Sequence, residues 1–98
     1  MLFQQKLPVA WLIAGLGNPG AKYENTRHNA GFMAADALAE HCHAGAWRLK
    51  FQAQTAQVVL GGQGVLLLKP LTYMNLSGEA VGEAARFYKL PADHVLVI

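Results

Sequence analysis

The feature that most constrains the fold is a continuous apolar run, Val9–Ala14, which ends directly at a glycine-rich segment, Gly15–Gly20. The run has the length of a β-strand, and its lack of polar alternation is typical of a strand covered on both faces. Such strands belong to open α/β sheets, which bind ligands beyond the carboxyl ends of their strands. Polar residues just after Ala14 are therefore expected at a functional edge of the sheet.

Two later segments have the periodicity of amphipathic helices. In residues 29–43 the apolar side chains recur at helical spacing, and Gly45 follows as the expected stop. Ser77 is expected to cap a second helix that runs to Lys89 and ends before Pro91. Each helix has one apolar stripe, which predicts packing against a sheet.

A glycine-rich link, residues 61–64, separates the β-type runs 55–60 and 65–68. A short link of this kind between two such runs predicts an antiparallel hairpin. Residues 69–75 are expected to leave the second strand as a loop, because Pro70 cannot continue a central strand. That loop places polar residues at a second strand end.

Residues 47–52 alternate as a half-buried strand or an extended loop would, and a last strand starts near His94. The order of segments predicts an α/β fold with three layers, α/β/α, around a mixed, partly parallel sheet. The chain has 98 residues, 53% of them hydrophobic, and His94–Ile98 ends without a polar cap. We therefore expect residues 1–98 to be the N-terminal part of one larger, truncated domain.

The composition limits the functional classes. A net charge of +2 does not by itself imply nucleic-acid binding, although several basic residues would matter if they shared a face. These residues are Lys22, Arg27, Arg48, Lys50 and Lys69. A single cysteine, Cys42, excludes an internal disulfide, and residues 1–8 lack the apolar core of a signal peptide. With no predicted membrane span, a cytoplasmic protein is expected.

The spacing Gly15-x-Gly17-x-x-Gly20 also matches the dinucleotide-binding pattern. A dinucleotide site needs a helix that begins within the glycines, so that its first amides meet the pyrophosphate. Here Asn18-Pro19-Gly20 has the signature of a type II turn, and helical spacing begins only after Thr26. A turn is favoured, and a dinucleotide-binding module is kept as an alternative.

His28 precedes the first helix, where the positive end of the helix dipole favours a neutral imidazole that can accept a proton. It is a candidate general base, and the alternative is a surface histidine near a helix cap. Asn18 and Asn75 both follow predicted strand ends, which places their amides at one edge of the sheet. Asn25 and Asn29 are better explained as turn and cap residues.

Other candidate residues have structural explanations of equal or greater weight. Tyr23, Tyr73 and Met74 are candidates for the wall of a substrate site, and packing explains them equally well. Adjacent helical positions cannot together supply tetrahedral ligands, so no metal site is expected at residues 41–43. No cofactor is expected.

Three separated motifs resemble those of one family, the bacterial-type peptidyl-tRNA hydrolases. They are Leu16-Gly17-Asn18-Pro19-Gly20 with Tyr23, then Thr26-Arg27-His28-Asn29-Ala30-Gly31, then Lys69-Pro70-Leu71-Thr72-Tyr73-Met74-Asn75-Leu76-Ser77-Gly78. Their order and spacing are similar to the family's, from about Trp11 onward. The similarity covers about the first half of a typical family member.

The resemblance implies hydrolysis of the ester that joins a peptide to the 3′-terminal ribose of tRNA, without a metal or cofactor. His28 matches the catalytic base, and Asn18 matches a position that distinguishes blocked from free aminoacyl groups. The remaining matches are a substrate-contacting amide, Asn75, and Tyr23 and Tyr73, which line the acceptor and peptide site. Met74 belongs to the same motif.

The chain stops at Ile98, at the end of its last predicted strand. The resemblance also implies an aspartate that orients His28 and that lies just after this strand in family members. A fragment without that carboxylate is expected to be weak or inactive. A noncatalytic tRNA-binding fragment is therefore a further alternative. The full-length protein is expected to act as a monomer on peptidyl-tRNA.

Overall fold

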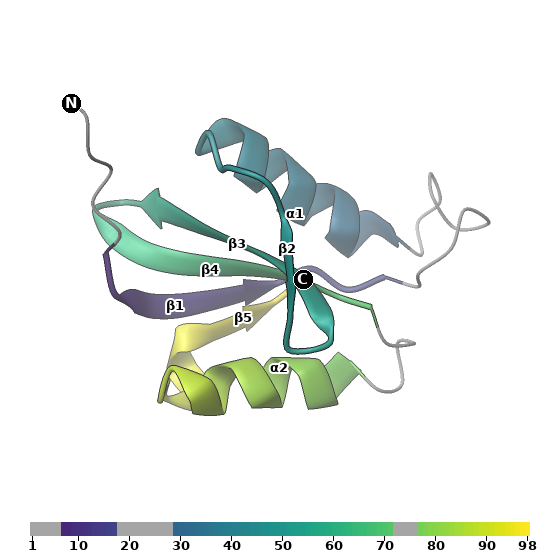
Figure 1. The fold of residues 1–98 in the computed structure, drawn as a ribbon, viewed down its shortest axis with the longest axis vertical. Coiled ribbons are helices and arrows are strands. Elements are labelled where there is room, and N and C mark those ends of the chain that lie inside the picture. The colour runs from purple at the N-terminus through teal and green to yellow at the C-terminus, as the bar shows by residue number, and fades with distance from the viewer. Residues whose placement is uncertain (1–6, 18–28, 72–76) are drawn as a thin grey trace.

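A computed structural model describes residues 7–17, 29–71 and 77–98. In Figure 1 a twisted sheet lies between helix α1 (Ala30–His41) and helix α2 (Ser77–Phe87). The described residues form five strands in the spatial order β2–β3–β4–β1–β5. Their bounds are Val9–Ala14 (β1), Arg48–Lys50 (β2), Ala53–Leu60 (β3), Gln63–Pro70 (β4) and Val95–Val97 (β5), the last preceded by a short 3-10 helix, Ala92–His94. The predicted three-layer α/β/α architecture is confirmed.

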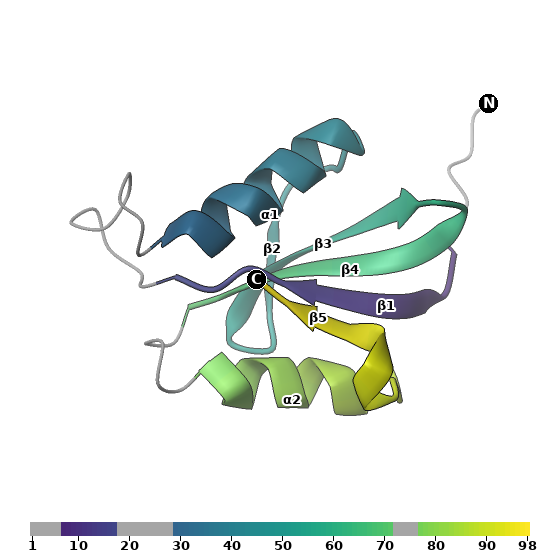
Figure 2. The same cartoon turned by 180° about the vertical axis from the view of Figure 1, so that it is seen from behind.

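The sheet is mixed, as the order of segments predicts. β1 lies parallel to β4 on one side and to β5 on the other, with Leu12 opposite both Leu66 and Val95. β2, β3 and β4 pair in antiparallel fashion. Because β1, β4 and β5 run in the same direction, their carboxyl ends share one edge of the sheet (Figure 2).

Each face of the sheet has its own core. On the α2 face, Leu12, Leu66 and Leu68 pack with alanines of α2. On the α1 face, Ile13 and Leu67 pack with Ala39 of α1, in the second core cluster. Burial on both faces explains why β1 has no polar alternation, and the prediction for Val9–Ala14 is confirmed.

The hairpin turn is tighter than the four-residue link predicted from the sequence. Only Gly61 and Gly62 form the turn, with φ of 60° and 77°. Two successive left-handed residues suit the twist of a two-residue hairpin, and glycine adopts them without a steric penalty. The strands therefore extend further, and β4 includes both Gln63 and Pro70.

The prediction that residues 69 and 70 belong to a loop is wrong. Lys69 pairs with Gln54, and Pro70, which is fully buried, pairs with Ala53 as the last residue of β4. Proline is tolerated there because it ends the strand instead of interrupting it. The backbone N–H of Leu71 then donates to the carbonyl of Gln52 (2.9 Å), which closes the end of the hairpin.

The helix ends also differ from the predicted ones. α1 ends at His41, and the left-handed residue after it is His43 (φ 55°), not Gly45. α2 ends at Phe87, before the predicted end at Lys89, which itself is left-handed (φ 56°). At each end, backbone N–H groups beyond the helix satisfy its last carbonyls, so neither Gly45 nor Pro91 is needed as the stop.

Residues 47–52, for which a strand and an extended loop were both open, contain the short strand β2. Phe51 and Gln52 then turn the chain into β3, both with φ of 57°. Phe51 is buried beneath α2, where its ring packs against those of Phe87 and Tyr88. This aromatic contact anchors the small β2–β3 turn to α2.

Candidate functional site

The candidate site lies at the edge where β1 and β4 end. Both helices also begin at this end of the sheet, as Figures 1 and 2 show. Helix N-termini carry unpaired N–H groups and a partial positive charge. The edge therefore combines strand carboxyl ends with two helix N-termini, an arrangement suited to a polar or anionic ligand.

Glycines let α1 approach the end of β1 at backbone distance. A Cβ atom added at Gly31 would lie 2.3 Å from the backbone nitrogen of Leu16, and one added at Gly15 would lie 2.1 Å from the carbonyl oxygen of Gly31. Neither position has room for a side chain. Gly15 and Gly31 therefore let α1 begin directly against the end of β1.

This packing bears on the dinucleotide alternative. α1 begins at Ala30, well after Gly20, so the described N–H groups at its start are not contributed by the glycine segment. Gly15 and Gly17 instead face the first turn of α1, where a Cβ at Gly17 would lie 2.8 Å from the ring of Phe32. The structure gives these two glycines a packing role, and no described feature favours a dinucleotide.

Asn29 joins the two motifs at this edge. Its side chain is buried, and a Cβ at Gly17 would lie 2.7 Å from its Oδ1 atom. Asn29 occupies the N-cap position of α1, as predicted for a residue at a helix start, although its side chain makes no capping hydrogen bond. In the sequence Asn18 directly follows Gly17, and His28 directly precedes Asn29. Gly17 and Asn29 lie close together, so the segments that contain Asn18 and His28 start from neighbouring points at this edge.

The six predicted site residues lie outside the described residues. They are Asn18, Tyr23, His28, Tyr73, Met74 and Asn75. Asn25, predicted as a turn residue, lies outside as well. Their roles stay predictions. The described structure gives the positions of the strand and helix ends that flank their segments.

Ser77 lies at the predicted start of α2, but its burial was not predicted from the sequence. It is the first residue of α2 and is 3% exposed, and its Oγ atom has no hydrogen-bond partner. The expected capping bond is therefore absent. A buried hydroxyl without a partner costs about 1–3 kcal/mol, and such exceptions in native proteins call for an explanation. The only sequence signal was the serine itself at the predicted start of a helix.

The basic residues do not share one face. Lys69 lies on the α1 face of β4, where its ammonium pairs with Asp36 at 2.5 Å and lies 4.2 Å from the centroid of the Trp47 ring. Arg48 and Lys50 lie on the opposite, α2 face, since they pair with Thr55 and Ala53 of β3. Lys22 and Arg27 lie outside the described residues.

Two classes of feature are absent from the described part of the chain. No three histidine, cysteine or acidic residues there are grouped closely enough to hold a metal ion. No helix within residues 7–17, 29–71 and 77–98 has both the length and the apolar character needed to cross a bilayer.

Comparisons with known proteins agree with this geometry. The family model described as peptidyl-tRNA hydrolase matches residues 12–98, which include every strand end and helix start at this edge. The chain belongs to the peptidyl-tRNA hydrolase family. The resemblance seen in the three motifs is thereby confirmed.

Relatives in the family are closely similar over most of this chain. Peptidyl-tRNA hydrolase of Rhizobium etli is 63% identical over 87 residues, which are 88% of this chain and 36% of the relative. That of Bartonella bacilliformis is 57% identical over 86 residues, 88% of this chain and 45% of the relative. The chain thus spans less than half the length of these curated relatives.

A crystal structure shows the same fold in the family. Peptidyl-tRNA hydrolase from Acinetobacter baumannii superposes with a TM-score of 0.83 at 35% sequence identity. The match covers 96% of this chain and 48% of the other. The mixed sheet with a helix on each face is therefore the family's arrangement for this part of the molecule.

Proposed function

We propose that this chain forms the N-terminal part of an enzyme that hydrolyses the ester bond of peptidyl-tRNA, releasing the peptide and the tRNA. The observation that carries the proposal is the family match over residues 12–98, because it includes all three motifs with the predicted site residues. Relatives that bear this name are 57–63% identical to the chain over the matched residues.

In the proposed mechanism His28 acts as the general base. It accepts a proton from a water molecule as the water oxygen attacks the ester carbonyl carbon. The bond between that carbon and the 3′-oxygen of the ribose then breaks, and the proton returns to the ribose oxygen. The products are the free peptide acid and a tRNA with a 3′-hydroxyl group.

The amides and aromatic residues of the motifs have positioning roles in this proposal. Asn18 and Asn75 supply hydrogen bonds to the peptide end of the substrate, since a neutral amide both donates and accepts. Tyr23, Tyr73 and Met74 form the wall against which the acceptor end and the peptide pack. The support is that both motif segments continue from one edge of the sheet, after β1 and after β4.

The proposed partner is the acceptor end of peptidyl-tRNA, and the proposed location is the cytoplasm, where that substrate forms. The full-length protein is proposed to act as a monomer. The reaction requires no cofactor, since a general base and a bound water supply its chemistry.

The test is hydrolysis of an N-blocked aminoacyl-tRNA by the full-length protein that contains this chain. His28→Ala is expected to lower kcat/KM by about 10²–10⁴-fold, the usual contribution of a general base. The matched control is His41→Ala, which removes an exposed histidine at the last position of α1 and leaves the rate unchanged. Undiminished hydrolysis by His28→Ala would remove the assigned role.

A further inference from the structure

The outer edge of β3 is only half covered. β2 pairs with β3 at three positions, from Lys50 opposite Ala53 to Arg48 opposite Thr55, whereas β4 pairs along the whole opposite side. No strand of the described chain lies against the outer side of residues 56–60. Residues 53–60 contain no charged residue and no proline, although natural proteins use both to keep exposed edges from pairing. An unprotected edge of this kind is suited to accepting another strand.

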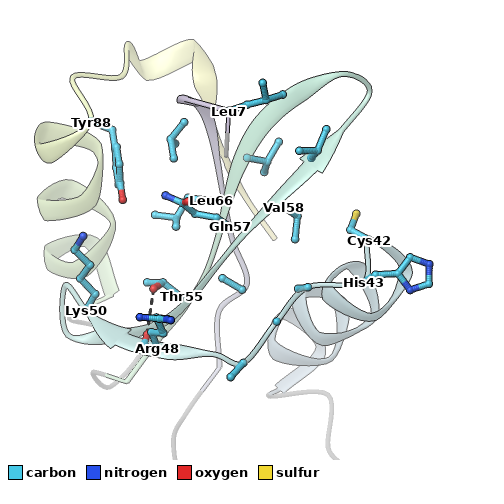
Figure 3. A pocket seen from close by; sticks show the side chains of 17 residues that line it. Leu7, Cys42, His43, Arg48, Lys50, Thr55, Gln57, Val58, Leu66 and Tyr88 are labelled. Carbon is cyan, nitrogen blue, oxygen red and sulfur yellow. Dashed lines mark hydrogen bonds between the residues drawn. The ribbon is translucent and has the colours of Figure 1, made fainter. Parts of the chain in front are cut away.

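The uncovered edge borders a hollow of about 640 Å³. Figure 3 shows Gln57 and Val58 of β3 in the middle of it, with Cys42 and His43 on one side and Tyr88 on the other. The side walls are the segments that follow α1 and α2. The hollow is therefore a groove along a strand edge.

The two sides of this groove differ in chemistry because β3 alternates between faces. On the α1 side, Ala56 and Val58 are buried and apolar, opposite Leu67 and Val65 of β4. On the α2 side, Gln57 is exposed and lies on the same face as Arg48 and Lys50. A strand added at this edge would meet an apolar wall on one face and a basic wall on the other.

The basic wall is held in place and is not neutralised. The Lys50 ammonium lies 4.7 Å from the ring centroid of Phe87 and 5.1 Å from that of Phe51. Neither Lys50 nor Arg48 forms an ion pair with a described carboxylate, and the described residues that line the groove include no aspartate or glutamate. Both cations are exposed and available to an anionic partner.

We infer that this groove binds an extended acidic peptide segment as an added strand beside β3. Main-chain hydrogen bonds to the free edge supply part of the affinity, and alternate side chains supply the specificity. Apolar residues of the peptide pack toward Val58, and acidic residues lie toward Arg48 and Lys50. A nucleic-acid strand suits the groove less well, because the edge offers main-chain groups and half of the lining is apolar. The inference does not depend on the hydrolytic activity.

The experiment measures amide hydrogen exchange of the full-length protein that contains this chain, with and without a blocked octapeptide of alternating valine and glutamate. The peptide is expected to slow exchange of the Gln57 and Val59 amides, which point to the free edge because Leu60 and Gln63 close the two-residue turn as a hydrogen-bonded pair. Arg48→Glu and Lys50→Glu are each expected to weaken binding about five-fold, the upper range for an exposed charge pair. The matched control is Arg86→Glu, the same charge change at an exposed position of α2 that does not line the groove.

Several results would overturn the inference. One is that the Gln57 and Val59 amides are already protected without peptide, because another part of the protein then covers this edge. A second is equal binding of an alternating valine–lysine peptide, and a third is equal weakening by Arg86→Glu. Protection of the Gln57 and Val59 amides by a short RNA oligonucleotide, but not by the acidic peptide, would assign the groove to nucleic acid instead.

Discussion

The backbone N–H of Leu16 donates a hydrogen bond to the carbonyl of Ile98 at 3.2 Å, joining the segment after β1 to the end of β5. The first turn of α1 lies directly on this bond, because Gly31 has no side chain to hold it away. Three segments that are distant in sequence thus meet at backbone distance. Their junction lies at the edge from which the residues proposed for catalysis extend.

Gly31→Ala is expected to destabilise the protein. The added Cβ would lie 2.3 Å from the nitrogen of Leu16 and 2.7 Å from the carbonyl oxygen of Ile98, so α1 must shift. Overpacking of this kind costs about 1–3 kcal/mol. Chemical denaturation measures the loss. The control is Gly45→Ala, because no atom lies within 4 Å of a Cβ there, and its stability should stay within about 0.5 kcal/mol of the parent.

The hairpin turn makes a second prediction. Gly62→Val is expected to lower the free energy of unfolding by about 1–2 kcal/mol, since φ at this position is 77° and an L-residue is strained in the left-handed region. Gly62→Asn should cost less, because asparagine tolerates that region. Equal thermal stability of the valine and asparagine variants would contradict the role of backbone strain.

The ion pair between Asp36 and Lys69 couples α1 to β4. A double-mutant cycle with Asp36→Asn and Lys69→Met should give a coupling energy of about 0.5–1 kcal/mol, since the Asp36 side chain is 53% exposed. The coupling should shrink in 1 M salt. Glu40→Gln, at an exposed position of the same helix, should show no coupling with Lys69→Met. A coupling that does not change with salt would argue against an ionic contact.

Ser77→Ala is expected to leave stability unchanged or to raise it by up to about 1 kcal/mol, because its buried hydroxyl has no hydrogen-bond partner to lose. Thr55→Val is the contrasting variant. The Thr55 hydroxyl donates to the carbonyl of Arg48 at 3.1 Å, and its removal should cost about 1 kcal/mol. A destabilised Ser77→Ala protein would show that the hydroxyl has a partner in solution.

The sequence predicted the layers of the fold because burial leaves a pattern. Val9–Ala14 is apolar throughout since helices cover both faces of β1, and the two helices show apolar stripes for the same reason. The ends of elements were less predictable. His43 and Lys89 adopt left-handed conformations that glycine usually occupies, so their residue types do not mark the helix ends.

The candidate site was predicted from motifs, and the structure adds a reason for their glycines. Gly15 and Gly31 lie far apart in the sequence and in contact in the fold, so no local pattern shows that each is required by the other. The unpartnered hydroxyl of Ser77 and the free edge of β3 were likewise invisible. The first depends on the absence of a hydrogen-bond partner and the second on the absence of a pairing strand among the described residues. Neither can be seen in a sequence, because both depend on contacts in space.

The topology of the sheet also sets an order of assembly. β3 and β4 are joined by a two-residue turn. β1 and β4 also pair, but α1, β2 and β3 lie between them in the sequence. Closing the short loop costs far less chain entropy than closing the long one. Loop-closure entropy therefore favours formation of the hairpin first, so that β1, which leads into the proposed catalytic segment, docks against a β4 that is already paired with β3.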